Sequence, residues 1–191
     1  MHDFPNILNI RGLGGIPTKD GSLVRAGKLL RSGHLHGASE QDLQILSERV
    51  NLVVDLRTDK ERQEKPNPPL ANAAYLHLPI LKSLAAGITK EKAAVENAVR
   101  DLSHDPEGAK QYMMRMYVNF VTDEFSVAQY AEFLRLLCED REGAVLWHCT
   151  AGKDRAGFAA VLIQEVLGVP REDIFEDYLL TNLCLKEEVA G

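Results

Sequence analysis

Continuous apolar runs and apolar positions at helical spacing alternate along the chain. Residues 51–57 (NLVVDLR) and 144–149 (AVLWHC) are apolar runs bounded by polar residues, a pattern typical of strands buried on both faces of a parallel sheet. Residues 74–80 (AYLHLPI) alternate and indicate a further strand. Residues 5–33 hold short apolar pieces separated by glycines and other turn formers. This pattern predicts several short strands.

The segments between the strands have helical periodicity. Ser39 followed by Asp42 looks like a capping box, and apolar residues recur at helical spacing after it. The polar stretch at 58–69 ends in prolines and is expected to be a short helix or loop at the surface. Further helices are predicted over residues 81–120 (with a break at 104–106), 124–139, 155–168 and 171–180.

Strands separated by helices predict an α/β fold with a central, mostly parallel sheet flanked by helices. The chain has 191 residues, enough for one domain with a hydrophobic core and too few for two comfortable ones. We therefore expect a single domain over residues 1–191, with a helical lid inserted at about 82–120.

Composition and charge exclude several classes of protein. The net charge of -6 lacks the basic excess of nucleic-acid-binding proteins, so an anionic substrate needs a local positive site. The three cysteines include no CxxC pair, which argues against a disulfide framework or a cysteine-rich zinc site. No signal peptide and no apolar run long enough to span a membrane is present. The expected location is the cytoplasm, with export by a route that needs no signal peptide left open.

The most informative segment is WHCTAGKDRAG, residues 147–157, which joins a predicted strand to a predicted helix. Unpaired backbone N–H groups and the helix dipole favour an anion at this position. A loop between Cys149 and Arg155 can curl so that its amides cradle phosphate oxygens, with Gly152 relieving the tight backbone. The planar fork of Arg155 can then bind two oxygens at once. The predicted substrate-binding residues of the loop are Thr150, Ala151, Gly152 and Lys153.

Cys149 is the predicted nucleophile. The field that attracts an anion also favours a thiolate over a thiol, and a thiolate facing a phosphate can form a phosphocysteine intermediate. The alternative is that Cys149 is a buried core thiol and residues 153–155 a solvated turn. The glycine, the arginine and the strand-to-helix setting together favour the catalytic interpretation.

HCTAGKDRAG strongly resembles the HCxxGKxR(T/S)G signature of the cysteine-dependent protein tyrosine and dual-specificity phosphatases. The resemblance is greatest to the bacterial and fungal tyrosine/phosphoinositide phosphatases whose loop reads HCxAGKDRTG. Further blocks in the same order are residues 9–15 (NIRGLGG), 30–32 (LRS), 54–57 (VDLR) with 61–62 (ER), and 177–180 (DYLL). These blocks cover roughly residues 6–182 and make the likeness more specific than the loop alone.

The chain departs from this family in three places. Gly12 stands where the family usually has Asp, and Ala156 replaces the Thr or Ser that usually follows the arginine. The chain also stops near the point where members generally continue with more helices, so we expect either a short member or a truncated one.

A general acid must protonate the leaving oxygen, and two aspartates compete for this role. The resemblance implies that Asp154, inside the loop, serves as acid and base. Asp55 ends the strand predicted at 51–55, and the carboxyl ends of parallel strands open on the edge where α/β folds place ligands. An N-cap or an ion pair with Arg57 would explain Asp55 without catalysis. We favour Asp154.

The predicted function is hydrolysis of phosphate monoesters, on phosphotyrosine proteins, phosphoinositides or both, without a metal or organic cofactor. Lys153 adds a second positive charge near the site, which favours phosphoinositides. The alternatives are a sulfurtransferase or arsenate reductase with a similar loop, or a pseudophosphatase that only binds phosphorylated ligands. The oligomeric state is left open.

Overall fold

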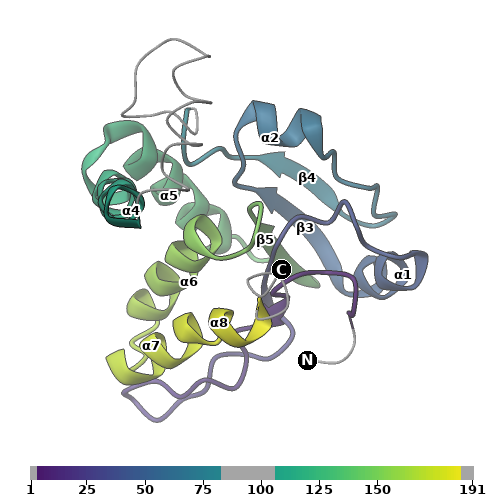
Figure 1. Ribbon diagram of the computed structural model, residues 1–191. Helices are drawn as coiled ribbons and strands as arrows, with labels where there is room; N and C mark the ends of the chain where they lie inside the picture. The colour runs from purple at the N-terminus through teal and green to yellow at the C-terminus, as the bar shows by residue number, and fades with distance from the viewer. Residues whose placement is uncertain (1–3, 83–105, 186–191) are drawn as a thin grey trace.

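A computed structural model describes residues 4–82 and 106–185 of the chain (Figure 1). The expected helical lid at about 82–120 falls largely on residues 83–105, outside this part, and stays a prediction. The elements in chain order are β1 (Arg11–Gly12), β2 (Leu29–Ser32), α1 (Glu40–Arg49), β3 (Val50–Asp55), α2 (Asp59–Glu64), β4 (Ala74–His77), α4 (Pro106–Thr122), α5 (Glu124–Leu137), β5 (Ala144–His148), α6 (Asp154–Val166), α7 (Arg171–Leu179) and α8 (Thr181–Cys184).

The strands form one sheet in the order β1-β2-β5-β3-β4. Strands β2, β5, β3 and β4 are parallel, and the two-residue β1 pairs antiparallel with β2. The predicted α/β fold with a mostly parallel sheet is therefore confirmed. Every residue of β5 is buried, because this strand has a neighbour on each side and helices over both faces.

Two apolar clusters cover the two faces of the sheet. Alternate residues of β3 and β5 point to opposite faces: Val54 and Trp147 join the cluster that includes Phe133 of α5, whereas Val53 and Leu146 join the cluster that contains Leu46 of α1. Figure 1 shows α5 and α6 on one side of the sheet and α1 on the other. The central strands are thus fixed from both sides, which holds their carboxyl ends at one edge.

Several helix starts follow local capping rules, and one start that lacks a side-chain cap bears on function. Ser39 and Asp42 form the expected capping box of α1, and Thr58 and Glu61 form a second one at α2. Helix α4 begins at Pro106, where the break was predicted. Helix α6 begins after Lys153, whose side chain makes no capping hydrogen bond. This N-cap residue therefore does not satisfy the first amide N–H groups of the helix.

Candidate active site

The loop from Cys149 to Lys153 connects the buried end of β5 to the start of α6. Cys149 is only 2% exposed, at the carboxyl end of the central strand. Gly152 has a φ of 68°, and a Cβ there would lie 2.4 Å from the backbone carbon of Ser32. Only glycine fits this position, because both the conformation and the close approach to β2 exclude a side chain.

The carbonyl groups of the loop are held from behind. The side-chain amide of Asn9 donates to the carbonyl of Gly152 at 2.9 Å and to that of Ala151 at 3.3 Å. Arg31 Nη2 donates to the Gly152 carbonyl at 2.9 Å and to the Lys153 carbonyl at 3.4 Å. In a trans peptide the N–H points opposite to the C=O. The N–H groups of residues 152–154 are therefore directed away from Asn9 and Arg31, as a cradle for an anion requires.

Asp177 of α7 anchors the arginines behind the loop. Its carboxylate accepts from Arg11 Nε at 2.9 Å and from Arg31 Nη1 at 3.2 Å. Burial, followed by the charge of Arg11, lowers the pKa of Arg31 to about 10, against the opposing effect of Asp177. Arg31 is therefore still charged at neutral pH. These arginines support the loop from its buried side, a role that the sequence analysis did not assign.

Arg155 lies in the first turn of α6 and is 7% exposed. Its Nη1 and Nη2 donate to the two carboxylate oxygens of Glu61 at 2.7 and 2.6 Å. Burial opposes ionisation of both groups, but the paired hydrogen bonds dominate. They raise the pKa of Arg155 above its ordinary value and lower that of Glu61 to about 2.

Glu61 is a site residue that the sequence analysis missed. Its carboxylate also accepts hydrogen bonds from the hydroxyl of Thr150 and from the backbone N–H and hydroxyl of Thr58. One side chain thus closes the capping box of α2 and fixes the loop arginine. The Thr58-x-x-Glu61 pattern and the family-like residues 61–62 were the available signals, but the first predicts only the helix start and the second carried no role for Glu61.

Asp55 lies at the end of β3, and both of its carboxylate oxygens accept hydrogen bonds. Arg57 donates to it through Nε at 2.9 Å and Nη2 at 2.7 Å, and Asn67 Nδ2 donates at 2.9 Å. Burial alone would raise the pKa of Asp55, but the hydrogen bond from Arg57 and the charges of His148 and Arg57 keep it below its ordinary value. The ion pair with Arg57 considered above is present.

His148, the residue before the nucleophile candidate, is completely buried. Burial lowers its pKa to about 4, although Asp55, 3.7 Å away, opposes the shift. The imidazole is therefore neutral at neutral pH, and its Nδ1 lies 3.2 Å from the carbonyl of Cys149.

Asp154 is the first residue of α6 and is half-buried. Its Oδ1 accepts a hydrogen bond of 2.6 Å from the hydroxyl of Tyr117 on α4, which in turn contacts the hydroxyl of Tyr178 on α7. Its Oδ2 has no hydrogen-bond partner among the described residues. The two candidate acids thus differ in availability, since the oxygens of Asp55 are occupied and one oxygen of Asp154 is not.

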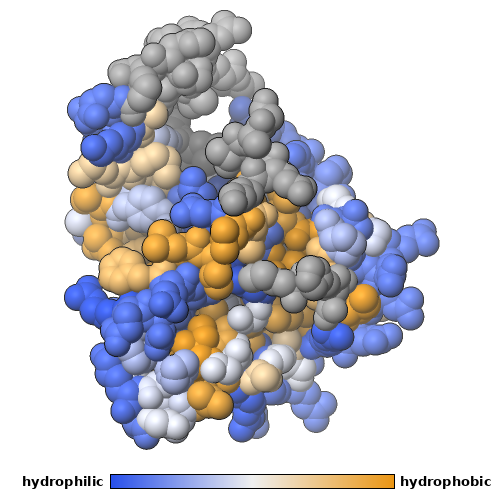
Figure 2. Space-filling view, turned by 60° about the horizontal axis from the view of Figure 1, so that its bottom comes forward, coloured by the Kyte–Doolittle hydropathy of each residue, from blue (hydrophilic) through white to orange (hydrophobic). Residues whose placement is uncertain are grey.

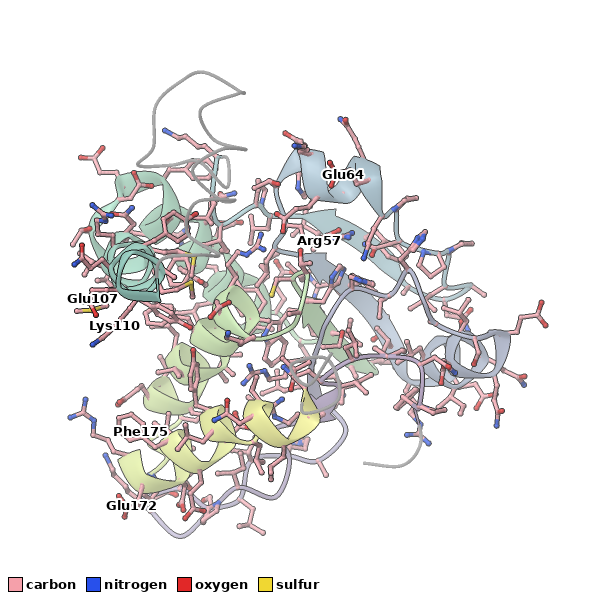
Figure 3. The ribbon with its side chains drawn as sticks, viewed as in Figure 1. Arg57, Glu64, Glu107, Lys110, Glu172 and Phe175 are labelled. Carbon is pink, nitrogen blue, oxygen red and sulfur yellow. The ribbon has the colours of Figure 1, made fainter. Side chains whose placement is uncertain are left out.

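A cavity of about 500 Å³ opens beside the loop, between α4, α6 and α7. Lys153 and Asp154 line its polar end, and Met113, Phe158 and Phe175 line its apolar part. Phe175 is 62% exposed and is labelled on α7 in Figure 3. Figure 2 shows a hydrophobic patch across the middle of one face of the molecule, with hydrophilic side chains around it. The mixed polar and apolar lining of the cavity suits a substrate that carries an apolar group next to its phosphate.

Within residues 4–82 and 106–185 no group of three or more His, Cys, Asp or Glu side chains is arranged to hold a metal ion. In the same part of the chain, no helix combines the length and apolarity needed to cross a membrane.

Comparisons with known proteins bear on the whole chain. A sequence model of the tyrosine phosphatase family matches residues 2–191. A protein of Cupriavidus necator, named as a tyrosine-protein phosphatase, is 32% identical over 187 residues, which cover 95% of this chain and 63% of that protein. The triple specificity protein phosphatase PtpB of Mycobacterium tuberculosis is 28% identical over 197 residues, covering 95% of this chain and 69% of PtpB. The chain thus spans about two thirds of the length of these relatives.

Among solved structures, that of P. aeruginosa TpbA aligns with a TM-score of 0.39 and 21% identity, over 82% of this chain and 70% of that one. This likeness is weak, so the assignment rests on the sequence matches.

Proposed function

Because the chain belongs to the tyrosine phosphatase family, we propose that it hydrolyses phosphate monoesters through a phosphocysteine intermediate. The observation that carries this proposal is the loop itself. Its carbonyls are tied back by Asn9 and Arg31, so its amides point away from these two side chains, and Arg155 lies close enough to Cys149 for their charges to interact. Residues 150–153 then hold the phosphate oxygens by their backbone, and Arg155 completes the cradle.

In the first step, the Cys149 thiolate attacks phosphorus and an S–P bond forms as the bond to the leaving oxygen breaks. Asp154 donates its proton to that oxygen, which leaves as an alcohol or phenol. The loop amides and Arg155 stabilise the charge that spreads over the three remaining phosphate oxygens in the transition state.

In the second step, the Asp154 carboxylate takes a proton from a water molecule, and the oxygen of that water attacks phosphorus. The S–P bond breaks, the thiolate returns and inorganic phosphate is released. Asp154 regains its proton in this step, so acid and base are the same residue.

The geometry supports Asp154 over Asp55 as the proton donor. Asp55 accepts hydrogen bonds from Arg57 and Asn67 at both oxygens and is 2% exposed, whereas Asp154 lines an open cavity. A carboxylate that is buried and paired with an arginine is held ionised and cannot easily supply a proton. In this scheme Asp55 is a structural anchor.

The test is release of phosphate from an aryl phosphate, with and without a chelator, combined with acid quenching to trap the phosphoenzyme. We expect turnover that is insensitive to chelator and a phosphoprotein that Cys149→Ala does not form. Phosphate binding without turnover would favour a pseudophosphatase. Sulfur transfer from thiosulfate or reduction of arsenate would favour the other two alternatives.

The finer substrate class rests on Lys153, which is exposed and lines the cavity at the loop. We propose that it extends the range from phosphotyrosine toward phosphoinositides, because a multiply phosphorylated ring offers this cation a second partner. The breadth implied by the name of the M. tuberculosis relative agrees with this. Lys153→Ala should weaken phosphoinositide turnover more than phosphotyrosine turnover, and equal losses would remove the argument.

A further inference from the structure

Three side chains from three helices meet beside the start of α6. The Tyr117 hydroxyl on α4 lies 2.6 Å from Asp154 Oδ1, and the Tyr178 hydroxyl on α7 is in hydrogen-bond contact with that of Tyr117. We propose that Tyr117 is a positioning residue that holds one carboxyl oxygen of Asp154, so that the proton is delivered from the other, with Tyr178 orienting the Tyr117 hydroxyl. This inference rests on the proposed function, in which Asp154 transfers the proton.

The direction of the hydrogen bonds follows from the inventory of donors. A carboxylate can only accept, so Tyr117 donates its one proton to Asp154 Oδ1. Tyr117 then has only acceptor capacity left, and Tyr178 must donate in the contact between the two hydroxyls. When Asp154 is protonated, the acid proton stays on Oδ2 because Oδ1 still accepts from Tyr117. The acid proton is therefore confined to the oxygen that has no partner among the described residues.

The two tyrosines are suited to remain donors. Burial, and then the hydrogen bond to Asp154, raises the pKa of Tyr117 far above its ordinary value, and burial raises that of Tyr178. Neither hydroxyl gives up its proton in the working range of pH. The ring of Tyr117 also packs edge-on against Phe120 with centroids 5.3 Å apart, so its position does not depend on the hydroxyl.

Titratable groups from several elements lie near Asp154. In the described part of the chain, burial and, to a lesser extent, the charge of Asp154 raise the pKa of Tyr117 of α4, Tyr130 of α5 and Tyr178 of α7, and Lys153 of the loop lines the same cavity. Of these, Tyr117 is the one whose side chain donates a hydrogen bond to the Asp154 carboxylate.

The test is Tyr117→Phe, which removes the hydroxyl and keeps the ring. Turnover should be measured on a series of phosphate monoesters with increasingly poor leaving groups. We expect kcat to fall by about tenfold or more on the poorest leaving group, by less than about threefold on the best, and KM to change little, because a good leaving group needs no acid.

Two further variants make the result interpretable. Tyr178→Phe should cause a smaller loss with the same dependence on the leaving group, because Tyr117 can still donate, and this variant decides the matter if Tyr117→Phe does not fold. Tyr75→Phe is the matched control. Tyr75 lies on β4, and its hydroxyl donates to the carbonyl of Pro68 at 2.7 Å, away from the loop. The kinetics of this variant should equal those of the wild type.

An inactive wild-type protein would overturn the proposed function and this inference with it. An active wild type, with losses in Tyr117→Phe that are equal across all leaving groups, would overturn this inference alone. That outcome would mean that Tyr117 only packs the three helices together.

Discussion

The two sides of the loop at residues 149–153 differ in how completely their polar groups are satisfied by hydrogen bonds. On the buried side, Arg31 and Asp177 are almost inaccessible and are linked by an ion pair, and Asn9 and Arg31 hold the loop carbonyls. On the open side, Lys153 is exposed and Asp154 keeps one oxygen without a partner among the described residues. Rigid support on one side leaves the other free for chemistry.

Asp55 and Asp154 show the same contrast for one residue type. Both lie at the edge of the sheet where β3 and β5 end. Asp55 is surrounded by donors that stabilise its charge, whereas Asp154 meets a single tyrosine hydroxyl and an open cavity. The difference teaches that position at a sheet edge alone does not identify a catalytic acid. What distinguishes the two is which groups already occupy the carboxyl oxygens.

The largest effects are expected from replacing Cys149 or Arg155, and the two variants should differ in whether they still bind an anion. Cys149→Ser should lower turnover by about 10⁴-fold or more, because a hydroxyl is a far poorer nucleophile, while vanadate or phosphate still binds to the amides and Arg155. Arg155→Ala should lose turnover and binding together. Calorimetric titration with vanadate measures the binding. More than a trace of activity in the serine variant would contradict the covalent mechanism.

Replacing Asp154 should mainly lower turnover, whereas replacing Asp55 should mainly lower the free energy of unfolding. Asp154→Asn should lower kcat by about 10²–10³-fold on a poor leaving group and leave stability nearly unchanged. Asp55→Asn should instead cost about 3–5 kcal/mol of unfolding free energy, because the buried charge of Arg57 loses its partner. Urea unfolding and steady-state kinetics on both variants test this contrast. A fully stable Asp55→Asn protein without activity would reverse the assignment.

Glu61→Gln should remove about 3 kcal/mol of stability at neutral pH, since the lowered pKa of Glu61 measures how strongly folding favours its charge. The folded pKa of about 2 lies below the ordinary value of 4.5. The contribution is therefore complete above pH 4.5, declines as the pH falls through this window, and should be roughly halved near pH 3.

Wild type and Glu61→Gln should be compared by urea unfolding at each pH. Both also lose stability between pH 6.5 and about 4, where the unfolded chain binds a proton at His148 that the folded protein excludes. That loss is common to the two proteins and cancels in the difference. A gap that stays constant down to pH 3 would show that the Glu61–Arg155 ion pair contributes little.

The smallest expected effect concerns Ala156, which is fully buried and whose carbonyl accepts from the Trp147 indole at 3.0 Å. In the proposed mechanism, we expect that a hydroxyl at this position would donate to the sulfur as it leaves the phosphocysteine, which alanine cannot do. We expect a burst of product and a steady rate that rises by about tenfold in Ala156→Thr. Ala156→Val is the control, because valine is close to threonine in size but has no hydroxyl. A wild-type trace without a burst, with no change in the mutant, would contradict this.

Much of the fold could be predicted from local pattern. The apolar runs at 51–57 and 144–149 became β3 and β5, side by side at the centre of the sheet, because unbroken apolar runs are buried on both faces. The position of the loop between a strand and a helix followed from the same pattern. The placement of Asp154 at the first turn of α6 then required no further information.

The supporting residues could not be predicted in the same way. Glu61 and Arg155 are 94 residues apart in sequence, and no local rule links a capping box to a distant arginine. Asp177 and Tyr178 stand in a block that resembles the family, but that likeness carried no role for either. Tyr117 looked like part of an apolar helix face, and its contact with Asp154 depends on how α4 packs against α6.

The contacts that hold the loop from behind also set the order in which this part of the structure can form during folding. Asp177 pairs with arginines 166 and 146 residues earlier, and these hold the loop together with Asn9. Contacts of such high sequence separation form late, because the intervening chain must first be ordered. A nascent chain that has exposed Cys149 and Arg155 but not yet residue 177 lacks the counter-ion that fixes its loop. We therefore expect Cys149 to emerge from the ribosome before the C-terminal residues that fix its loop.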